Sequence, residues 1–195
     1  MAGKVSVGAS FADIDNDGRP DLLVTTVRQG TVLFHNEGGG RFRDITAEAG
    51  VSSGKPTHGS GAVFFDYDRD GKLDLFVCNV GVYTRNEKGR AGEYVGRSDA
   101  FQGWQYPERS EVSPLFRNRG DGRFENASEA TGLVHRAWSG DATFCDLDAD
   151  GFPELYVLSM SGEDRYYSNR QGSRFEDRTA AFFPKTPWGS MGVKF

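Results

Sequence analysis

Apolar residues recur at every second position over short stretches of the chain, and turns rich in Gly and Asp separate these stretches. The first two stretches place apolar side chains or Thr at Val5, Val7, Ala9 and Phe11, and then at Leu22, Val24 and Thr26. A period of two residues is typical of β-strands with one buried face, whereas an amphipathic helix shows a period of about 3.6. The pattern therefore predicts an all-β protein built from short strands.

One strand-and-loop pattern occurs three times without a gap. The copies read FADIDNDGRPDLLV from Phe11, FFDYDRDGKLDLFV from Phe64 and FCDLDADGFPELYV from Phe144. Each is followed by a second repeated block, in which an aromatic residue and an Asn two positions later precede a Gly-containing turn. The aromatic–Asn pairs are Phe34 and Asn36, Phe116 and Asn118, and Tyr167 and Asn169. Each unit therefore contains the same set of strands.

Four short antiparallel strands per repeated unit predict the blades of a β-propeller. A stacked β-solenoid is the competing interpretation, but its coils are usually much shorter than these units. The first blade is expected at residues 5–50, the second at 58–133 with an insertion at 81–114, and the third at 138–183.

Residues 188–195 resemble the run into each acidic loop and are expected to begin a fourth blade. Known propellers close with about four to eight blades. We therefore expect a fragment of a larger propeller, and its uncovered end blades favour self-association.

Charge and composition exclude several classes of protein. The chain has 28 acidic and 23 basic residues and no stripe of Lys and Arg, which argues against a nucleic-acid partner. No apolar run approaches the ~18 residues that a membrane helix needs, so no transmembrane segment is expected. Cys78 and Cys145 fall at different places in the repeat, which favours two free thiols over a disulfide.

The repeated loops carry the candidate chemistry, because each places carboxylates at positions 1, 3, 5 and 9. These residues are Asp13, Asp15, Asp17 and Asp21; Asp66, Asp68, Asp70 and Asp74; and Asp146, Asp148, Asp150 and Glu154. Oxygen donors with no nearby Cys or His in the sequence favour Ca²⁺ or Mg²⁺. Calcium is preferred because a flexible loop can supply six or seven oxygens, including the position 7 carbonyls of Arg19, Lys72 and Phe152.

The loops differ from an EF-hand, which needs a bidentate Glu at position 12 and two flanking helices. Position 12 holds Val24, Val77 or Val157, so the ninth-position acid is expected to close each site. A single acidic turn is also explained as an ordinary solvated turn. Three matching copies favour about three bound ions, with the occupancy of the third loop left open because Glu154 replaces Asp.

These loops, followed by LFxN-like strands and GxGRFxD-like turns, resemble FG-GAP/VCBS repeats. More narrowly, the chain is similar to the ASPIC/UnbV-associated group, which is related to the cartilage acidic protein family. The resemblance implies an FG-GAP β-propeller, a Ca²⁺ in each loop, an extracellular, periplasmic or cell-envelope location, and no established catalytic activity.

The insertion at 81–114 is the candidate recognition surface, because it combines aromatic residues with several Arg, a composition enriched at binding hot spots. The candidate partner-binding residues are Tyr83, Tyr94, Trp104 and Tyr106. The alternative is that the insertion covers its own blade with these rings buried. Trp138, Trp188 and His58 precede the acidic loops at matching places, and a packing role is expected for all three.

Two functions remain open from the sequence. The first is a non-enzymatic extracellular module that binds Ca²⁺ and a protein or glycan partner. The second is part of a propeller enzyme, a polysaccharide lyase or hydrolase, with its chemistry near the inner strands. The sequence offers no convergent acids or bases beyond the repeated loops, which favours the first.

Overall fold

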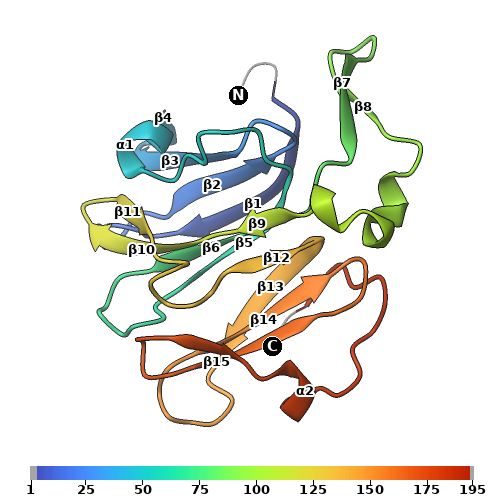
Figure 1. Ribbon diagram of the computed structural model, residues 1–195. Coiled ribbons are helices and arrows are strands. Elements are labelled where there is room, and N and C mark those ends of the chain that lie inside the picture. Colours follow the sequence, from blue (N-terminus) through green and yellow to red (C-terminus); the bar gives the residue numbers. More distant parts are fainter. Residues whose placement is uncertain (1–3, 194–195) are drawn as a thin grey trace.

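The computed structural model describes residues 4–193, without the side chains of Phe101 and Trp104, and the described chain is an all-β structure (Figure 1). Its main elements are three antiparallel four-stranded sheets. The first sheet contains β1 (Ser6–Ala12), β2 (Asp21–Thr26), β3 (Thr31–Gly38) and β4 (Arg41–Asp44); the second contains β5 (Gly59–Phe65), β6 (Asp74–Asn79), β10 (Leu115–Gly120) and β11 (Arg123–Asn126); the third contains β13 (Ser139–Cys145), β14 (Glu154–Ser159), β15 (Arg165–Asn169) and β16 (Phe175–Asp177). The all-β prediction is confirmed.

The remaining elements are short. They are the hairpin β7 (Thr84–Lys88) and β8 (Tyr94–Gly96), the pair β9 (Glu111–Ser113) and β12 (His135–Ala137), the α-helices α1 (Thr46–Ala49) and α2 (Thr179–Phe182), and the 3-10 helices η1 (Ala100–Gln105) and η2 (Pro107–Arg109). Over the described residues the three main sheets follow one another without closing into a ring (Figure 1).

Two hydrophobic clusters join the sheets in sequence order. Cross-strand register places residues of alternating parity on opposite faces of each sheet. One face of the first sheet, with Leu23 and Leu33, packs against the face of the second sheet that carries Leu75 and Phe116. The opposite face of the second sheet then packs against the third sheet in the same way, through a cluster that includes Phe65, Phe76, Leu155 and Tyr167. Each internal interface therefore uses one face from each of two successive units.

The outer face of the first sheet has no such partner among the described residues. Phe11 is 64% exposed and Phe42 is 42% exposed. Their equivalents in the second sheet are Phe64, which packs against the first cluster, and Phe124, which is only 7% exposed. The alternation in β1 predicted a half-buried strand, but its apolar side chains are exposed because no neighbouring sheet covers them.

The first strands of the three sheets lie side by side and approach closely through glycines (Figure 1). A Cβ on Gly8 would lie 2.6 Å from the carbonyl oxygen of Ser60, and one on Gly140 would lie 2.8 Å from that of Ser190. Since such contacts exclude a side chain, glycine is required where these backbones meet. Residues 188–193 continue this series in space but form no strand, and residues 194–195 of the expected fourth unit lie outside the described part.

The expected packing roles hold for two of the three residues that precede the acidic loops. Trp138 is 6% exposed and His58 is fully buried, whereas Trp188 is 65% exposed. The correction for Trp188 has a physical reason, because no sheet follows residue 188 in the described chain to cover the ring, which lies beside the turn at Gly162.

The insertion contains more regular structure than its sequence suggests. The hairpin β7–β8 projects to one side of the sheets (Figure 1). The end of the insertion returns as β9, which pairs with β12 just before the third sheet begins. Cys78 and Cys145 are both free, and burial raises the pKa of the Cys78 thiol.

A pair of matched substitutions tests the uncovered face. Phe11→Ser should reduce self-association at high protein concentration and leave the unfolding free energy unchanged within about 0.5 kcal/mol, because the ring is exposed. Phe64→Ser, at the equivalent position of the second sheet, should lower the unfolding free energy by about 2 kcal/mol. Sedimentation velocity and urea unfolding measure the two effects. Self-association that is equally strong in Phe11→Ser would refute the assignment of this face.

Candidate metal centre

Each acidic loop follows the first strand of its sheet, so all three begin at the same end of these neighbouring strands. The first Asp of the loop accepts hydrogen bonds from the backbone of the turn that follows it. The Asp13 carboxylate accepts from the N–H groups of Asp17, at 3.0 Å, and Gly18, at 2.8 Å. Asp66 and Asp146 make the matching bonds to Gly71 and Gly151, both at 2.9 Å.

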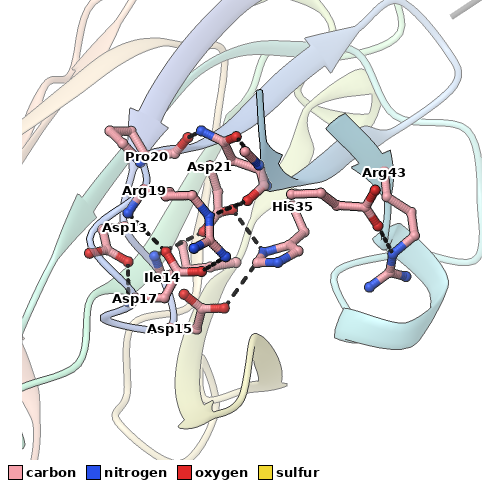
Figure 2. A network of polar contacts seen from close by, with 12 residues as sticks. Asp13, Ile14, Asp15, Asp17, Arg19, Pro20, Asp21, His35 and Arg43 are labelled. Carbon is pink, nitrogen blue, oxygen red and sulfur yellow. Dashed lines mark hydrogen bonds and ion pairs between the residues drawn. The ribbon is translucent and has the colours of Figure 1, made fainter. Parts of the chain in front are cut away.

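The turns require their glycines. The φ angles of Gly18, Gly71 and Gly151 are +84°, +83° and +92°, in the left-handed region that side chains disfavour. This backbone brings the carboxylates at positions 1 and 3 of each loop close together, and in the second loop the carboxylate at position 5 joins them. Figure 2 shows the residues of the first loop.

The ninth-position acids are buried, with Asp21, Asp74 and Glu154 each at most 1% exposed. Each carboxylate joins two segments of its own unit. Asp74 accepts a hydrogen bond from the N–H of Tyr67, at 3.1 Å, and another from the N–H of Asn118 on β10, at 2.7 Å. Asp21 does the same with Ile14 and Asn36, and Glu154 with Leu147 and Asn169. These acids therefore fasten the loop to the third strand of the sheet.

Burial disfavours the ionised form of several loop carboxylates. It raises the pKa of Asp74 to about 7, although the hydrogen bonds from the Asn118 and Tyr67 N–H groups lower it. Burial also raises the pKa of Asp15, Asp68 and Glu154. At Asp70 the same desolvation is outweighed by hydrogen bonds from Lys72, and the pKa is lowered. A bound cation would favour the ionised carboxylates and reverse the raised values.

The structure brings most of the expected ligands together. Oxygen atoms of three acids lie within 4.8 Å of one another in each loop: Asp13, Asp15 and Asp21; Asp66, Asp68 and Asp70; and Asp146, Asp148 and Glu154. Among the described residues, Asp15 Oδ1 is buried and has no hydrogen-bond partner, so this oxygen is free to coordinate a cation. This donor set suits a hard, oxygen-seeking ion.

Other expected ligands lie outside these groups. Asp17 groups with Asp15 and His35, and it also pairs with Arg19 (Figure 2). Neither Asp74 nor Asp150 belongs to such a group among the described residues. At position 7, the N–H groups of Arg19, Lys72 and Phe152 donate to the fifth-position acids at 2.8, 3.0 and 2.8 Å. Metal binding by their carbonyl oxygens stays a prediction.

A side chain of the third strand faces the first and second acidic loops, and neither neighbour was predicted from the sequence. His35 Nδ1 lies 3.1 Å from Asp21 Oδ1 and 3.5 Å from Asp15 Oδ2 (Figure 2). In the second unit the Arg117 guanidinium lies 2.5 Å from Asp68, and the third unit has Ser168 at this position. The signal was available in the sequence, because each of these residues precedes the repeated Asn.

The repeated Asn residues connect neighbouring units, which the sequence analysis also missed. Asn118 Nδ2 donates to the carbonyl oxygen of Ile14 in the first acidic loop, at 2.8 Å, and to that of Leu73 in its own unit, at 3.0 Å. Asn169 repeats the arrangement, with Tyr67 of the second loop at 2.9 Å and Pro153 at 3.0 Å. Each acidic loop that has a following unit is thus held by an Asn from that unit.

The expected partner-binding rings are half-buried and engaged within the chain. The Arg28 guanidinium lies over the Tyr94 ring at 4.7 Å, and the Arg109 guanidinium lies over Tyr106 at 3.7 Å. Tyr83 packs against His58, with 4.8 Å between ring centroids. The side chain of Trp104 lies outside the described part.

Successive four-stranded antiparallel sheets, each with an acidic loop of the same geometry, define a β-repeat protein with repeated candidate cation sites. The profile of the FG-GAP-like repeat family matches residues 9–77 and 96–157, and the chain belongs to this family. The resemblance found in the sequence is therefore confirmed.

Cartilage acidic proteins are similar to a shorter part of the chain. Cartilage acidic protein 1 from Mus musculus and from Homo sapiens are each 36% identical over 72 residues. The match spans 37% of this chain and 11% of the length of each relative. A solved structure of an Agrocybe aegerita lectin that recognises non-reducing terminal N-acetylglucosamine is 16% identical, covering 86% of this chain and 50% of the lectin chain. The TM-score between the two structures is 0.29.

None of the helices among the described residues is long and apolar enough to cross a membrane.

Two Asn substitutions separate the bond between units from the bonds within a unit. Asn118→Ala should lower the unfolding free energy by about 2–4 kcal/mol, because it leaves buried carbonyl groups of two units unpaired. Asn36→Ala removes the matching bond to Pro20 and the turn contact to Gly38, and should cost about 1 kcal/mol. Urea unfolding measures both. Equal losses would show that the bond between units adds nothing.

Proposed function

We propose that this chain is a calcium-binding, non-catalytic interaction module of a β-propeller protein, located outside the cell or in the cell envelope. Its three sheets correspond to blades at 5–50, 58–133 and 138–183, with a fourth beginning near residue 188. The proposal is supported chiefly by one observation, the recurrence in each loop of a group of close acids beside a buried ninth-position carboxylate. Membership of the FG-GAP-like repeat family and similarity to cartilage acidic proteins support the location.

The proposed ligands of the three ions are those of the sequence prediction, with the grouped carboxylates as the first candidates. In the first loop these are Asp13, Asp15 and Asp21. An ion there would compensate charge that is now partly buried and would hold the loop in a single conformation. Because Asn118 and Asn169 bond to the first and second loops, ordering these loops would also stabilise the contacts between units.

The partner of the module is proposed to be a protein or a glycan. The alternative function is part of a propeller enzyme that acts on polysaccharide. It would need acids or bases converging away from the three loops. Among the described residues, side chains that could together hold a metal ion cluster only in these three loops, where His35 joins the acids of the first loop. This distribution favours the binding module.

Calcium should raise the melting temperature. If the ion binds only the folded chain, a concentration 100 times the Kd adds ~2.7 kcal/mol per site. Extracellular sites often have Kd values of about 10⁻⁴–10⁻³ M, so the comparison is between EDTA and several millimolar Ca²⁺. Asp15→Asn should remove one site and part of the shift, while Glu48→Gln, at an exposed acid outside the loops, should leave the shift intact. A melting temperature unaffected by Ca²⁺ would overturn the proposal.

The second loop should bind Ca²⁺ more weakly than the others, because the Arg117 guanidinium already neutralises Asp68. Arg117→Ser copies the residue at this position of the third unit, Ser168, and should strengthen binding at the second loop about tenfold, or ~1.4 kcal/mol. Arg119→Ser is the matched control, since this guanidinium pairs with Glu125 instead. Isothermal titration calorimetry resolves the change, and equal affinities for all three proteins would refute the role of Arg117.

A further inference from the structure

The position before the repeated Asn of the third strand holds a different residue in each unit. In the first unit His35 on β3 brings an imidazole to the acidic loop, whereas in the second unit Arg117 brings a guanidinium. The third unit has Ser168 at this position. Of these groups, the imidazole alone is a common nitrogen ligand of metal ions. The three loops therefore do not offer the same donors to a cation.

The imidazole of His35 lies among the carboxylates of the first loop. Ligand atoms of Asp15, Asp17 and His35 lie within 4.8 Å of one another (Figure 2). His35 Nδ1 is 3.5 Å from Asp15 Oδ2 and 3.1 Å from Asp21 Oδ1. In a tetrahedral zinc site with bonds of about 2.0–2.1 Å, neighbouring donor atoms are about 3.3 Å apart. The distances around the ring therefore suit neighbouring donors of one small ion.

The Asp15 carboxylate has an oxygen available for such an ion. Its Oδ1 is buried and has no hydrogen-bond partner among the described residues. Asp15 also belongs to both groups of candidate ligands in this loop. One group adds Asp13 and Asp21, and the other adds Asp17 and His35. An ion held by Asp15 therefore has two possible sets of neighbours, one of oxygen atoms alone and one that includes nitrogen.

The site is accessible from solvent. Asp15 and His35 both line a cavity of about 640 Å³, and the His35 side chain is 19% exposed. The other two imidazoles lack this access, because His58 and His135 are buried and both ring nitrogens of each contact side chains of the chain itself. Of the three imidazoles, His35 is therefore the one that a metal ion can reach.

The nitrogen donor changes which cation the first loop favours. Ca²⁺ and Mg²⁺ take oxygen ligands, so the ring adds nothing to their binding. Imidazole suits Zn²⁺ and its transition-metal neighbours, and zinc sites combine His nitrogen with carboxylate oxygen. Three protein ligands also leave a position for water, which the cavity can supply.

We propose that the first acidic loop is a mixed nitrogen–oxygen site that selects a divalent transition-metal ion of the zinc class over Ca²⁺, with His35 Nδ1, Asp15 and Asp17 as its ligands. Asp17 also pairs with Arg19, but this guanidinium is 44% exposed, and an ion replaces such a contact at little cost. Ca²⁺ occupies this loop where no such ion is present. The inference rests on the cation binding proposed above and adds a second class of metal.

The test uses Zn²⁺ alone as the probe, added to the whole chain at neutral pH in several millimolar Ca²⁺. Isothermal titration calorimetry should show a single Zn²⁺ site. Long-range nitrogen-15 NMR detects the imidazole ring nitrogens, and the His35 signals should shift in a saturable manner. The signals of the buried rings of His58 and His135 should stay in place.

Three variants test the nitrogen ligand. His35→Gln removes the imidazole but keeps a polar side chain, and should weaken Zn²⁺ binding at least tenfold. Arg117→His places an imidazole at the matching position of the second unit, beside Asp68, and should add a second Zn²⁺ site. Arg119→His is the matched control and should add none, since Arg119 pairs with Glu125 instead of a loop acid.

His35 ring signals that Zn²⁺ leaves unmoved would overturn the inference, because His35 would then serve only as a hydrogen-bond partner of Asp21. Zn²⁺ affinity that is unchanged in His35→Gln, or no second site in Arg117→His, would overturn it as well.

Melting temperatures in EDTA and in Ca²⁺ separate this inference from the proposed function. A Ca²⁺ response without Zn²⁺ binding at His35 would refute the mixed site alone. Zn²⁺ binding at His35 without any Ca²⁺ response would refute the calcium-binding module and leave the mixed site standing.

Discussion

The cost of burying a carboxylate governs this structure. A buried acid must be hydrogen-bonded or neutralised, and the ninth-position acids satisfy this condition by accepting backbone N–H groups from two segments at once. At Asp74 one donor comes from the acidic loop and the other from β10, so the loop cannot move independently of the sheet. The loop geometry, the orientation of its carboxylates and the path of the third strand all depend on this pair of bonds.

The same third strand carries the contact to the preceding unit. Asn118 follows Arg117, which faces the acidic loop of its own unit, and its side chain donates to the carbonyl of Ile14 in the first loop. The backbone of Ile14 thus bonds to Asp21 through its N–H and to the next unit through its carbonyl. Hydrogen bonds at the loops and hydrophobic clusters between the sheets therefore stabilise the same interfaces. Where no unit covers a face, as at Phe11, the apolar residues stay exposed.

The two ends of the first strands have different chemistry. At one end carboxylates gather and burial raises the pKa of several of them, which suits a hard cation. At the other end lies a mostly apolar, uncharged cavity that includes Trp138 and a wall from the insertion. The proposed ions and a partner at this cavity would therefore not compete for the same residues. It is consistent with a binding module whose metal sites are structural.

Period-two alternation and the three ungapped loops were sufficient to predict the all-β class, the repeat and the grouped acids, because strand pairing and turn chemistry depend on residues close in sequence. Sequence spacing could not show that Phe11 is exposed while Phe64 is covered, since the two residues have the same local pattern and differ only in their neighbours. It also could not show that Arg117 lies beside Asp68 or that Asn118 bonds to the first loop. These features join residues far apart in the chain, and only the packing of one sheet on the next brings them together.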